Sequence, residues 1–308
     1  MREALVIYAK GLAMGTADVV PGVSGATIAL IVGIYDRLIR AITSIDPREL
    51  RTVLGVHRRS GRAEAVDTFE RMDGHFLVPL GLGIVSAFVA LVAVIDVLLA
   101  VYPVPTYAFF FGLIAASAVV LYAEIDVFTP GRILLAVLAI GFALFVTGIT
   151  ARNPSHGPVM VFVSGAIAIS AMVLPGVSGS FFLLVLGQYE YMLGVLRRFL
   201  DGVVAVGTGG SSEALVESGP IVAIFVGGAC LGLLTSAHAV RFALDRYRAA
   251  TLTVLVSLMV GALRSPATHV AENLDGSTAG SPELAALAAL TGAACVLALD
   301  HWTDDLTY

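Results

Sequence analysis

The sequence contains the stretch Pro21-Gly22-Val23-Ser24-Gly25-Ala26-Thr27-Ile28, and a near-copy occurs downstream as Pro175-Gly176-Val177-Ser178-Gly179-Ser180-Phe181-Phe182. The likeness continues to Tyr35 and Tyr189, so that eight of the sixteen aligned residues from position 21 to 36 are identical. Apolar segments that match by chance share Leu, Val and Ala rather than an aligned Pro-Gly-x-Ser-Gly. The chain is therefore predicted to be a duplication, with repeat 1 at residues 1–150 and repeat 2 at residues 151–308.

The composition of the chain is typical of a membrane protein. Hydrophobic residues make up 58 % of the 308 residues and charged residues only 13 %, whereas a soluble domain carries roughly 25 % charged residues. The mean hydropathy is +0.92. Six apolar runs approach the length that crosses about 30 Å of hydrocarbon. They cover residues 76–101, 105–123, 131–150, 219–243, 250–263 and 283–300. The sequence therefore predicts an all-α, polytopic protein of the cell (plasma) membrane.

Each Pro-Gly-x-Ser-Gly motif interrupts an apolar stretch. Pro21 and Pro175 lack a backbone N–H, and the neighbouring glycines accept many backbone angles, so we expect the helix to break at each motif. The apolar segments that lead to the motifs are short for a full crossing. We therefore predict two re-entrant helical hairpins, at residues 4–40 and 157–196. Their tips should line a cavity, because bare backbone at membrane depth must be satisfied by protein or water.

About three transmembrane helices follow each hairpin, within residues 76–150 in repeat 1 and 219–300 in repeat 2. A hairpin adds an even number of crossings, so each repeat has an odd total and the second copy is inverted relative to the first. If the N-terminus and the loop 41–75 are cytoplasmic, the inner face carries fourteen Lys and Arg residues, and the outer face, with the loop 197–218, carries four. The positive-inside rule then predicts that both termini are cytoplasmic.

The two tips carry residue types that bind a phosphate. We expect a helix to restart near Val23 and near Val177, with N–H groups that lack intrahelical partners and with partial positive charge from the helix dipole. Backbone N–H groups and hydroxyls in such a place form an anion site. The candidate ligands are Gly22, Ser24, Gly25 and Thr27 in the first tip and Gly176, Ser178, Gly179 and Ser180 in the second. The alternative is that Ser24 and Ser178 only cap helices and that the glycines permit close packing.

Two charged residues stand out within the apolar segments. Asp18 precedes Pro21 by three positions, and Met172 takes its place in repeat 2. We therefore expect a single proton- or cation-coupling site at Asp18, with local capping of a helix as the alternative. Arg264 ends an apolar run. It is the candidate cationic ligand of the phosphate, or else a side chain that reaches the outer boundary of the membrane.

Other chemistry is not indicated. Cys230 and Cys295 lie in separate apolar runs, and they are predicted to be small buried residues rather than a disulfide or a metal pair. No spacing of His, Cys and carboxylate residues suggests a metal site, and no glycine-rich phosphate loop is present. We expect no cofactor and no nucleic-acid partner. The sequence does not indicate an oligomeric state.

Longer motifs around the tips resemble one known family. They are Met14-Gly15-Thr16-Ala17-Asp18-Val19-Val20-Pro21-Gly22-Val23-Ser24-Gly25-Ala26-Thr27, then Gly33-Ile34-Tyr35, and Leu174-Pro175-Gly176-Val177-Ser178-Gly179-Ser180. With Phe110-Phe111-Gly112-Leu113-Ile114 and the stretch from Gly261 to Arg264, the chain resembles the polyprenyl-phosphate transporter (PopT-like) family over most of its length. The family was formerly a domain of unknown function. Ala26 departs from the resemblance, since a glycine is expected there.

The resemblance implies a flippase that returns a polyprenyl phosphate carrier from the outer to the cytoplasmic leaflet for envelope glycan synthesis. The carrier would be undecaprenyl phosphate, or dolichyl phosphate in an archaeon. Moving a phosphate through hydrocarbon is costly because the charge loses its hydration. We expect the headgroup to bind between Ser24/Thr27 and Ser178/Ser180 with help from Arg264, while the tail stays among membrane lipids and the repeats rock to alternate access.

Two other classes of function are compatible with parts of the pattern. A small-anion channel or exchanger is one, since helix N-termini with serine and glycine also suit chloride. A polyprenyl pyrophosphate phosphatase is the other, because membrane phosphatases of this type resemble the chain in having inverted repeats and a Pro-Gly-x-Ser tip. Those enzymes carry an arginine after the serine and a cluster of glutamates. Here Gly25 and Gly179 follow the serines and the chain has no Glu-Glu pair, so hydrolysis lacks its general base and metal ligands. We expect a transporter and not an enzyme.

Overall fold

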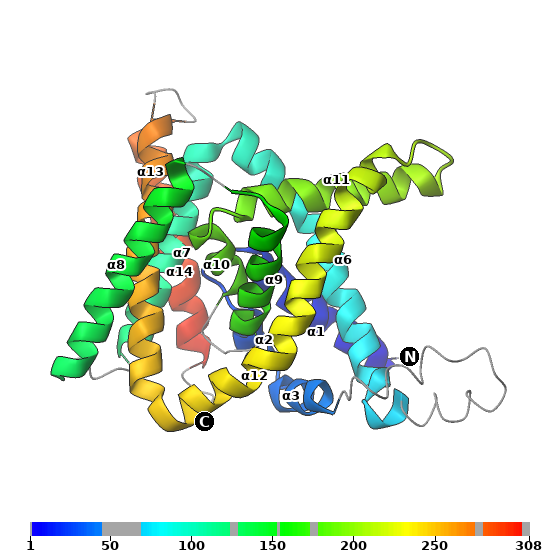
Figure 1. Cartoon of the computed structure of the whole chain (residues 1–308), viewed down its shortest axis with the longest axis horizontal. Coiled ribbons are helices and arrows are strands. Elements are labelled where there is room, and N and C mark those ends of the chain that lie inside the picture. The colour runs from blue at the N-terminus through cyan, green and yellow to red at the C-terminus, as the bar shows by residue number, and fades with distance from the viewer. Residues whose placement is uncertain are drawn as a thin grey trace. The chain divides into compact units, whose positions relative to one another are not determined.

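The computed structural model describes residues 2–44, 69–123, 129–152, 155–172, 178–274 and 280–303. Every regular element within these ranges is a helix (Figure 1), as the composition predicts. The chain divides into two compact units. Unit 1 comprises residues 1–17 and 25–88, and unit 2 comprises residues 18–24 and 89–308.

Unit 1 is built from short helices and the beginning of a long one. Its elements are α1 (Arg2–Val19, except its last two residues), α2 (Gly25–Ile31), α3 (Tyr35–Thr43) and the first part of α6 (Gly74–Val101). Glycine lets α1 and α6 approach closely, because a methyl group at Gly15 would lie 2.7 Å from the carbonyl oxygen of Ile84. Such small-residue contacts are a common way for helices to pack in membranes.

Polar contacts hold α2 and α3 in place within unit 1. Lys10, the single lysine of the chain, donates to the carbonyl oxygen of Val32, just after α2, at 2.5 Å. Arg37 on α3 donates to the two carboxylate oxygens of Asp73 at 2.6 and 2.9 Å. Its guanidinium also lies 4.5 Å from the centre of the Phe76 ring. Arg37 thereby fastens α3 to the start of α6 by a bidentate ion pair and a cation–π contact.

Unit 2 holds the remaining helices together with the end of α6. They are α7 (Pro103–Ala123), α8 (Pro130–Arg152), α9 (Pro158–Met172), α10 (Gly179–Val185), α11 (Tyr189–Gly207), α12 (Glu213–Ala262), α13 (Arg264–Asn273) and α14 (Pro282–Thr303). Within this unit α7 packs against α13 and α14, and α12 packs against α8, α9 and α11 (Figure 1). Glycines form these contacts too: a methyl group at Gly112 would collide with the carbonyl oxygen of Ala289, and one at Gly228 with that of Phe162.

Five helical segments of the described chain are long and apolar enough to cross a membrane. The pair α10–α11 is bent by 115° at its break, and counting it as one span makes up to six. The five are Gly74–Val101, Pro103–Tyr122, Pro130–Gly148, Glu213–Leu233 and Arg246–Asn273. Large apolar side chains on them are open to the surroundings, such as Leu138 at 60 % and Val226 at 50 % exposure. Such a surface is favourable against lipid and unfavourable against water. The predicted multi-pass membrane protein is confirmed.

The same membrane setting corrects one prediction. Cys230 and Cys295 are exposed, so the expectation that they are buried is wrong. An apolar residue in a soluble protein is usually buried, but a helix surrounded by lipid carries apolar residues on its outer face as well.

Repeat 1 and repeat 2 share local structure in detail, and each segment after the motif contains a second break that the sequence analysis did not predict. α2 and α10 have seven residues each and occupy equivalent positions. Gly33 and Gly187 follow with φ of +69° and +64°. The N–H of Ile34 donates to the carbonyl of Ala29, and that of Gln188 to Leu183, at 2.9 and 2.8 Å. These bonds between residues five apart, with glycine at the left-handed position, form a Schellman C-cap. The inverted arrangement of the repeats stays a prediction.

Two segments of repeat 2 extend beyond their expected boundaries. α11 continues to Gly207, so the first half of the segment 197–218, expected as a loop, is helical. The paired arginines at 197 and 198 end the apolar run but not the helix, because a helix keeps its backbone bonds through charged residues. α12 contains both apolar runs of residues 219–263, with a kink at Tyr247. Most of the loop expected at 41–75 lies outside the described residues.

Candidate functional site

The break at the first motif is present in the structure, and both helices that follow the motifs begin slightly later than expected. α2 begins at Gly25 rather than Val23, and α10 begins at Gly179 rather than Val177. The serine before each glycine is therefore the first residue outside its helix, which is the position of an N-cap.

The first tip, residues 18–24, belongs to unit 2. Pro21 is fully buried, and Asp18 and Ser24 are only 5 % and 6 % exposed. Gly22 has a φ of +93°, which glycine adopts without the steric cost of a Cβ. An added methyl group would also lie 3.0 Å from the backbone nitrogen of Ile114. The tip thus needs a glycine for its conformation and for its close approach to α7.

Ser178 connects the second tip to the first within unit 2. The N–H of Gly22 donates to Ser178 Oγ at 3.3 Å, and Ser117 Oγ on α7 donates to the carbonyl oxygen of Gly22 at 2.7 Å. Ser178 Oγ also accepts from the N–H of Phe181 at 3.3 Å, so that it caps α10. Ser180 Oγ lies 3.0 Å from Ser178 Oγ. Both members of this hydroxyl pair are buried.

Tyr189 joins this contact to a neighbouring cavity. Its hydroxyl donates to the carbonyl oxygen of Val19 at 2.9 Å, and its ring meets Phe110 edge-on at 5.9 Å between centroids. The same residue lines a cavity of about 430 Å³ in unit 2. The Gly187–Tyr189 turn therefore lies between the tips and the cavity.

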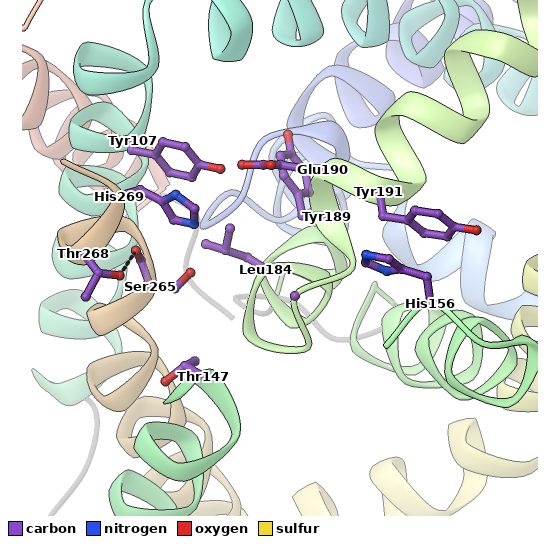
Figure 2. A pocket seen from close by; sticks show the side chains of 11 residues that line it. Tyr107, Thr147, His156, Leu184, Tyr189, Glu190, Tyr191, Ser265, Thr268 and His269 are labelled. Carbon is purple, nitrogen blue, oxygen red and sulfur yellow. Dashed lines mark hydrogen bonds between the residues drawn. The ribbon is translucent and has the colours of Figure 1, made fainter. Parts of the chain in front are cut away.

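The cavity is lined by aromatic and hydroxyl side chains (Figure 2). Its walls are formed by Tyr107, Thr147, His156, Leu184, Gly187, Tyr189, Glu190, Tyr191, Ser265, Thr268 and His269. His269 stacks on Tyr107 at 4.3 Å between centroids, and His156 stacks on Tyr191 at 4.0 Å. Figure 2 shows the two stacked pairs on opposite sides of the cavity, with Glu190 between them.

Hydrogen bonds to backbone carbonyls orient several side chains in the cavity wall and directly behind it. Gln188 is fully buried, and its amide nitrogen donates to the carbonyl oxygen of Ser155 at 2.9 Å. Its amide oxygen lies 3.3 Å from Nδ1 of His156. Thr147 Oγ1 donates to the carbonyl oxygen of Ala143 at 2.7 Å, and Thr268 Oγ1 donates to that of Ser265 at 2.8 Å.

Residues 14–278 match the family model described as Undecaprenyl phosphate translocase-like. The matched segment includes both tips and every residue that lines the cavity. The chain belongs to this translocase-like family.

Two curated proteins support the assignment. The chain is 41 % identical over 263 residues to a polyprenyl-phosphate transporter of Vibrio cholerae, covering 84 % of this chain and 76 % of that protein. It is 29 % identical over 266 residues to a polyprenyl-phosphate transporter of Staphylococcus aureus, covering 82 % of this chain and 83 % of that protein. No solved structure gives a significant match.

In this translocase-like protein, the residues predicted to bind phosphate are distributed over different parts of the structure. Gly22, Ser24, Ser178, Gly179 and Ser180 lie in unit 2, where Ser178 contacts Gly22 and Ser180. A methyl group at Gly179 would lie 2.6 Å from the carbonyl oxygen of Ala168, so this glycine permits α10 to pack on α9. Two further predicted residues, Gly25 and Thr27, form the first turn of α2 in unit 1. Pro175 and Gly176 lie outside the described residues.

Arg264 is exposed at the start of α13 and does not line the cavity. Its Nη1 donates to the carbonyl oxygen of Leu144 on α8 at 3.2 Å, and a methyl group at Gly148 would lie 3.0 Å from the same nitrogen. Ser265 and Thr268, which follow it on α13, do line the cavity. The guanidinium therefore lies against the end of α8.

The cavity itself was missed by the sequence analysis. His156 and His269 are far apart in the chain, and only the tertiary packing of unit 2 places them around one space, together with residues of α7, α8, α10 and α11. A signal did exist: the duplicated segment extends to Tyr189 and Glu190, which match Tyr35 and Asp36 of repeat 1. Both residues of repeat 2 line the cavity.

Proposed function

We propose that this protein is a membrane transporter that carries polyprenyl phosphate from the outer to the cytoplasmic leaflet, for reuse in envelope glycan synthesis. The observation that carries the proposal is the 41 % identity to a polyprenyl-phosphate transporter over 84 % of the chain. The multi-pass helical structure and the membership of the translocase-like family support it. The chain acts as a transporter and not as an enzyme.

The headgroup binds at the tips in this proposal, through Ser24 from repeat 1 and Ser178 and Ser180 from repeat 2. The buried pair of hydroxyls 3.0 Å apart supports this assignment. In the described state Ser178 Oγ accepts hydrogen bonds from two N–H groups, those of Gly22 and Phe181. A phosphate oxygen accepts the same donors, so binding would replace the contact between the tips by contacts to the ligand. The proposed site depends on these hydroxyls and not on the N-termini of α2 and α10, because both helices are only seven residues long.

Further parts of the proposal concern topology, coupling and the approach of the headgroup. Both termini are cytoplasmic, and the two repeats are inverted and rock to alternate access. Asp18, which is 5 % exposed near the first tip, takes up the coupling proton. Arg264 attracts the headgroup from outside, where its exposed guanidinium lies against α8. An Asp18→Asn protein whose transport keeps its rate and its pH dependence would exclude coupling through this carboxylate.

Leaflet movement of a fluorescent polyprenyl phosphate in proteoliposomes tests the function. Wild type should move the lipid, and Ser24→Ala/Ser178→Ala should move it much more slowly while eluting as a folded protein. Equal activity of the two proteins would leave the serines as helix caps. A folded wild type that moves chloride but no polyprenyl phosphate would point to an anion channel, and release of inorganic phosphate would point to an enzyme.

A further inference from the structure

The cavity in unit 2 is rich in groups that accept hydrogen bonds. Thr268 donates its hydroxyl hydrogen to a backbone carbonyl, so its oxygen can accept a hydrogen bond from a ligand. Glu190 adds a carboxylate to the wall. None of the described residues that line the cavity is a lysine or an arginine. A phosphate bound here would need to bring a proton or to meet a protonated histidine.

Hydrogen-bond accounting fixes the orientation of His156. The nitrogen of the Gln188 amide must face Ser155, because the carbonyl oxygen there can only accept. The amide oxygen then faces Nδ1 of His156, which lies 3.3 Å away. Nδ1 must carry a hydrogen to bond to it, and the remaining ring nitrogen, Nε2, is left for a ligand. His156 lines the cavity, and Figure 2 shows its ring next to that of Tyr191.

We propose that this cavity binds the phosphate monoester headgroup of the transported lipid at a step of transport separate from its contact with the tips, with Nε2 of His156 sharing one proton with a phosphate oxygen. The proposal rests on the transport function argued above. Gln188 acts as the positioning residue, since it touches His156 and not the headgroup. The cavity of about 430 Å³ is large enough for a phosphate and the first isoprene unit, and Leu184 supplies an apolar contact.

The proton balance gives the proposal its signature. Either the monoanion of the headgroup donates its O–H to neutral Nε2, or protonated Nε2 donates to the dianion. Both descriptions contain one proton in the same hydrogen bond. Histidine and phosphate monoesters both release protons between about pH 5 and 8. At higher pH neither free partner holds the proton, so binding must take it from solvent, and affinity falls about tenfold per pH unit.

Other titratable groups face the same space. They are Tyr107 on α7, Tyr189, Glu190 and Tyr191 on α11, and His269 on α13, while α8 contributes Thr147. Repeat 1 offers no equivalent arrangement, because Ile34 occupies the position of Gln188. The test must therefore separate His156 from Glu190 and His269.

Calorimetric titration of purified protein with farnesyl phosphate, in buffers of different ionisation enthalpy, measures the protons taken up. Wild type should take up about one proton per headgroup at pH 8, falling toward zero near pH 6. His156→Gln retains an amide donor close to the place of Nε2 without an exchangeable charge. It should bind with no proton uptake and with an affinity that changes less than about twofold from pH 6 to 8. His301→Gln, the same change at an exposed histidine outside the cavity, should behave as wild type.

The outcomes distinguish this proposal from the proposed function. Wild type that moves polyprenyl phosphate between leaflets, but binds farnesyl phosphate without proton uptake, overturns the His156 site and leaves the function intact. Uptake that persists in His156→Gln and disappears in Glu190→Gln or His269→Gln also overturns it. Failure of wild type to bind or move the lipid rejects the transport function itself. If His156→Gln does not fold, absence of proton uptake by wild type still overturns the proposal, and uptake that persists in both Glu190→Gln and His269→Gln supports it.

Discussion

Gly22→Ala should destabilise the first tip strongly. Gly22 has a φ of +93°, where an L-residue costs about 1–2 kcal/mol. The new methyl would lie 3.0 Å from both the backbone nitrogen and Cγ1 of Ile114, and overpacking of this kind costs about 1–3 kcal/mol. Together we expect a loss of about 2–5 kcal/mol of unfolding free energy. The hydrogen bonds that Gly22 makes with Ser117 and Ser178 should also weaken.

Two matched variants separate strain from crowding. Gly33→Ala adds the same methyl at a φ of +69° with no atom within 4 Å, and it should lose only about 1–2 kcal/mol. Gly141→Ala, in the middle of α8 with nothing within 4 Å, should gain about 0.5–1 kcal/mol because alanine favours a helix. Denaturant unfolding in mixed micelles measures all three. If Gly22→Ala is as stable as Gly33→Ala or more stable, the first tip does not contact α7 as closely as described.

The remaining predictions concern other contacts. The hydrogen bonds from Arg37 hold the pKa of Asp73 below its ordinary value. Their contribution to stability is therefore complete at neutral pH and is lost as the pH falls below about 4. Asp73→Asn should remove this acid-dependent part of the unfolding free energy, measured from pH 3 to 7. Ser178→Ala should lower the unfolding free energy by about 2 kcal/mol, because it removes the cap of α10 and the acceptor of the Gly22 N–H. Ser180→Ala should lower it by less than about 1 kcal/mol. Equal losses of stability in thermal unfolding would contradict the role of Ser178 as the cap. Gly112→Val should push α7 away from α14, because even a methyl group collides with the Ala289 carbonyl oxygen. We expect a loss of about 1–3 kcal/mol of unfolding free energy. Gly81→Val is the control, because no atom lies within 4 Å of a methyl group at that position.

Much of the fold could be read from local pattern. The apolar runs correspond to α6, α7, α8, α12 and α14 because a membrane helix must be apolar along its length, which is visible in sequence. The break at the first tip follows from Pro21 and Gly22, because the backbone limits of proline and glycine are properties of single residues. The second break, at Gly33 and Gly187, was equally local, yet it was missed because the apolar run continues through it.

What the sequence alone determined is the recurrence of the Pro-Gly-x-Ser-Gly motif, the membrane class and the first residues at which the backbone turns, since each depends on neighbours along the chain. The tertiary structure decided which polar groups meet. It bonded Ser178 to Gly22, placed Arg264 against α8, and gathered His156, Glu190 and His269 around one cavity. Helices in lipid lack the water-driven alternation of polar and apolar faces that reveals packing in soluble proteins, so the faces that meet are set by shape and by glycine contacts. No pattern along the chain encodes that choice.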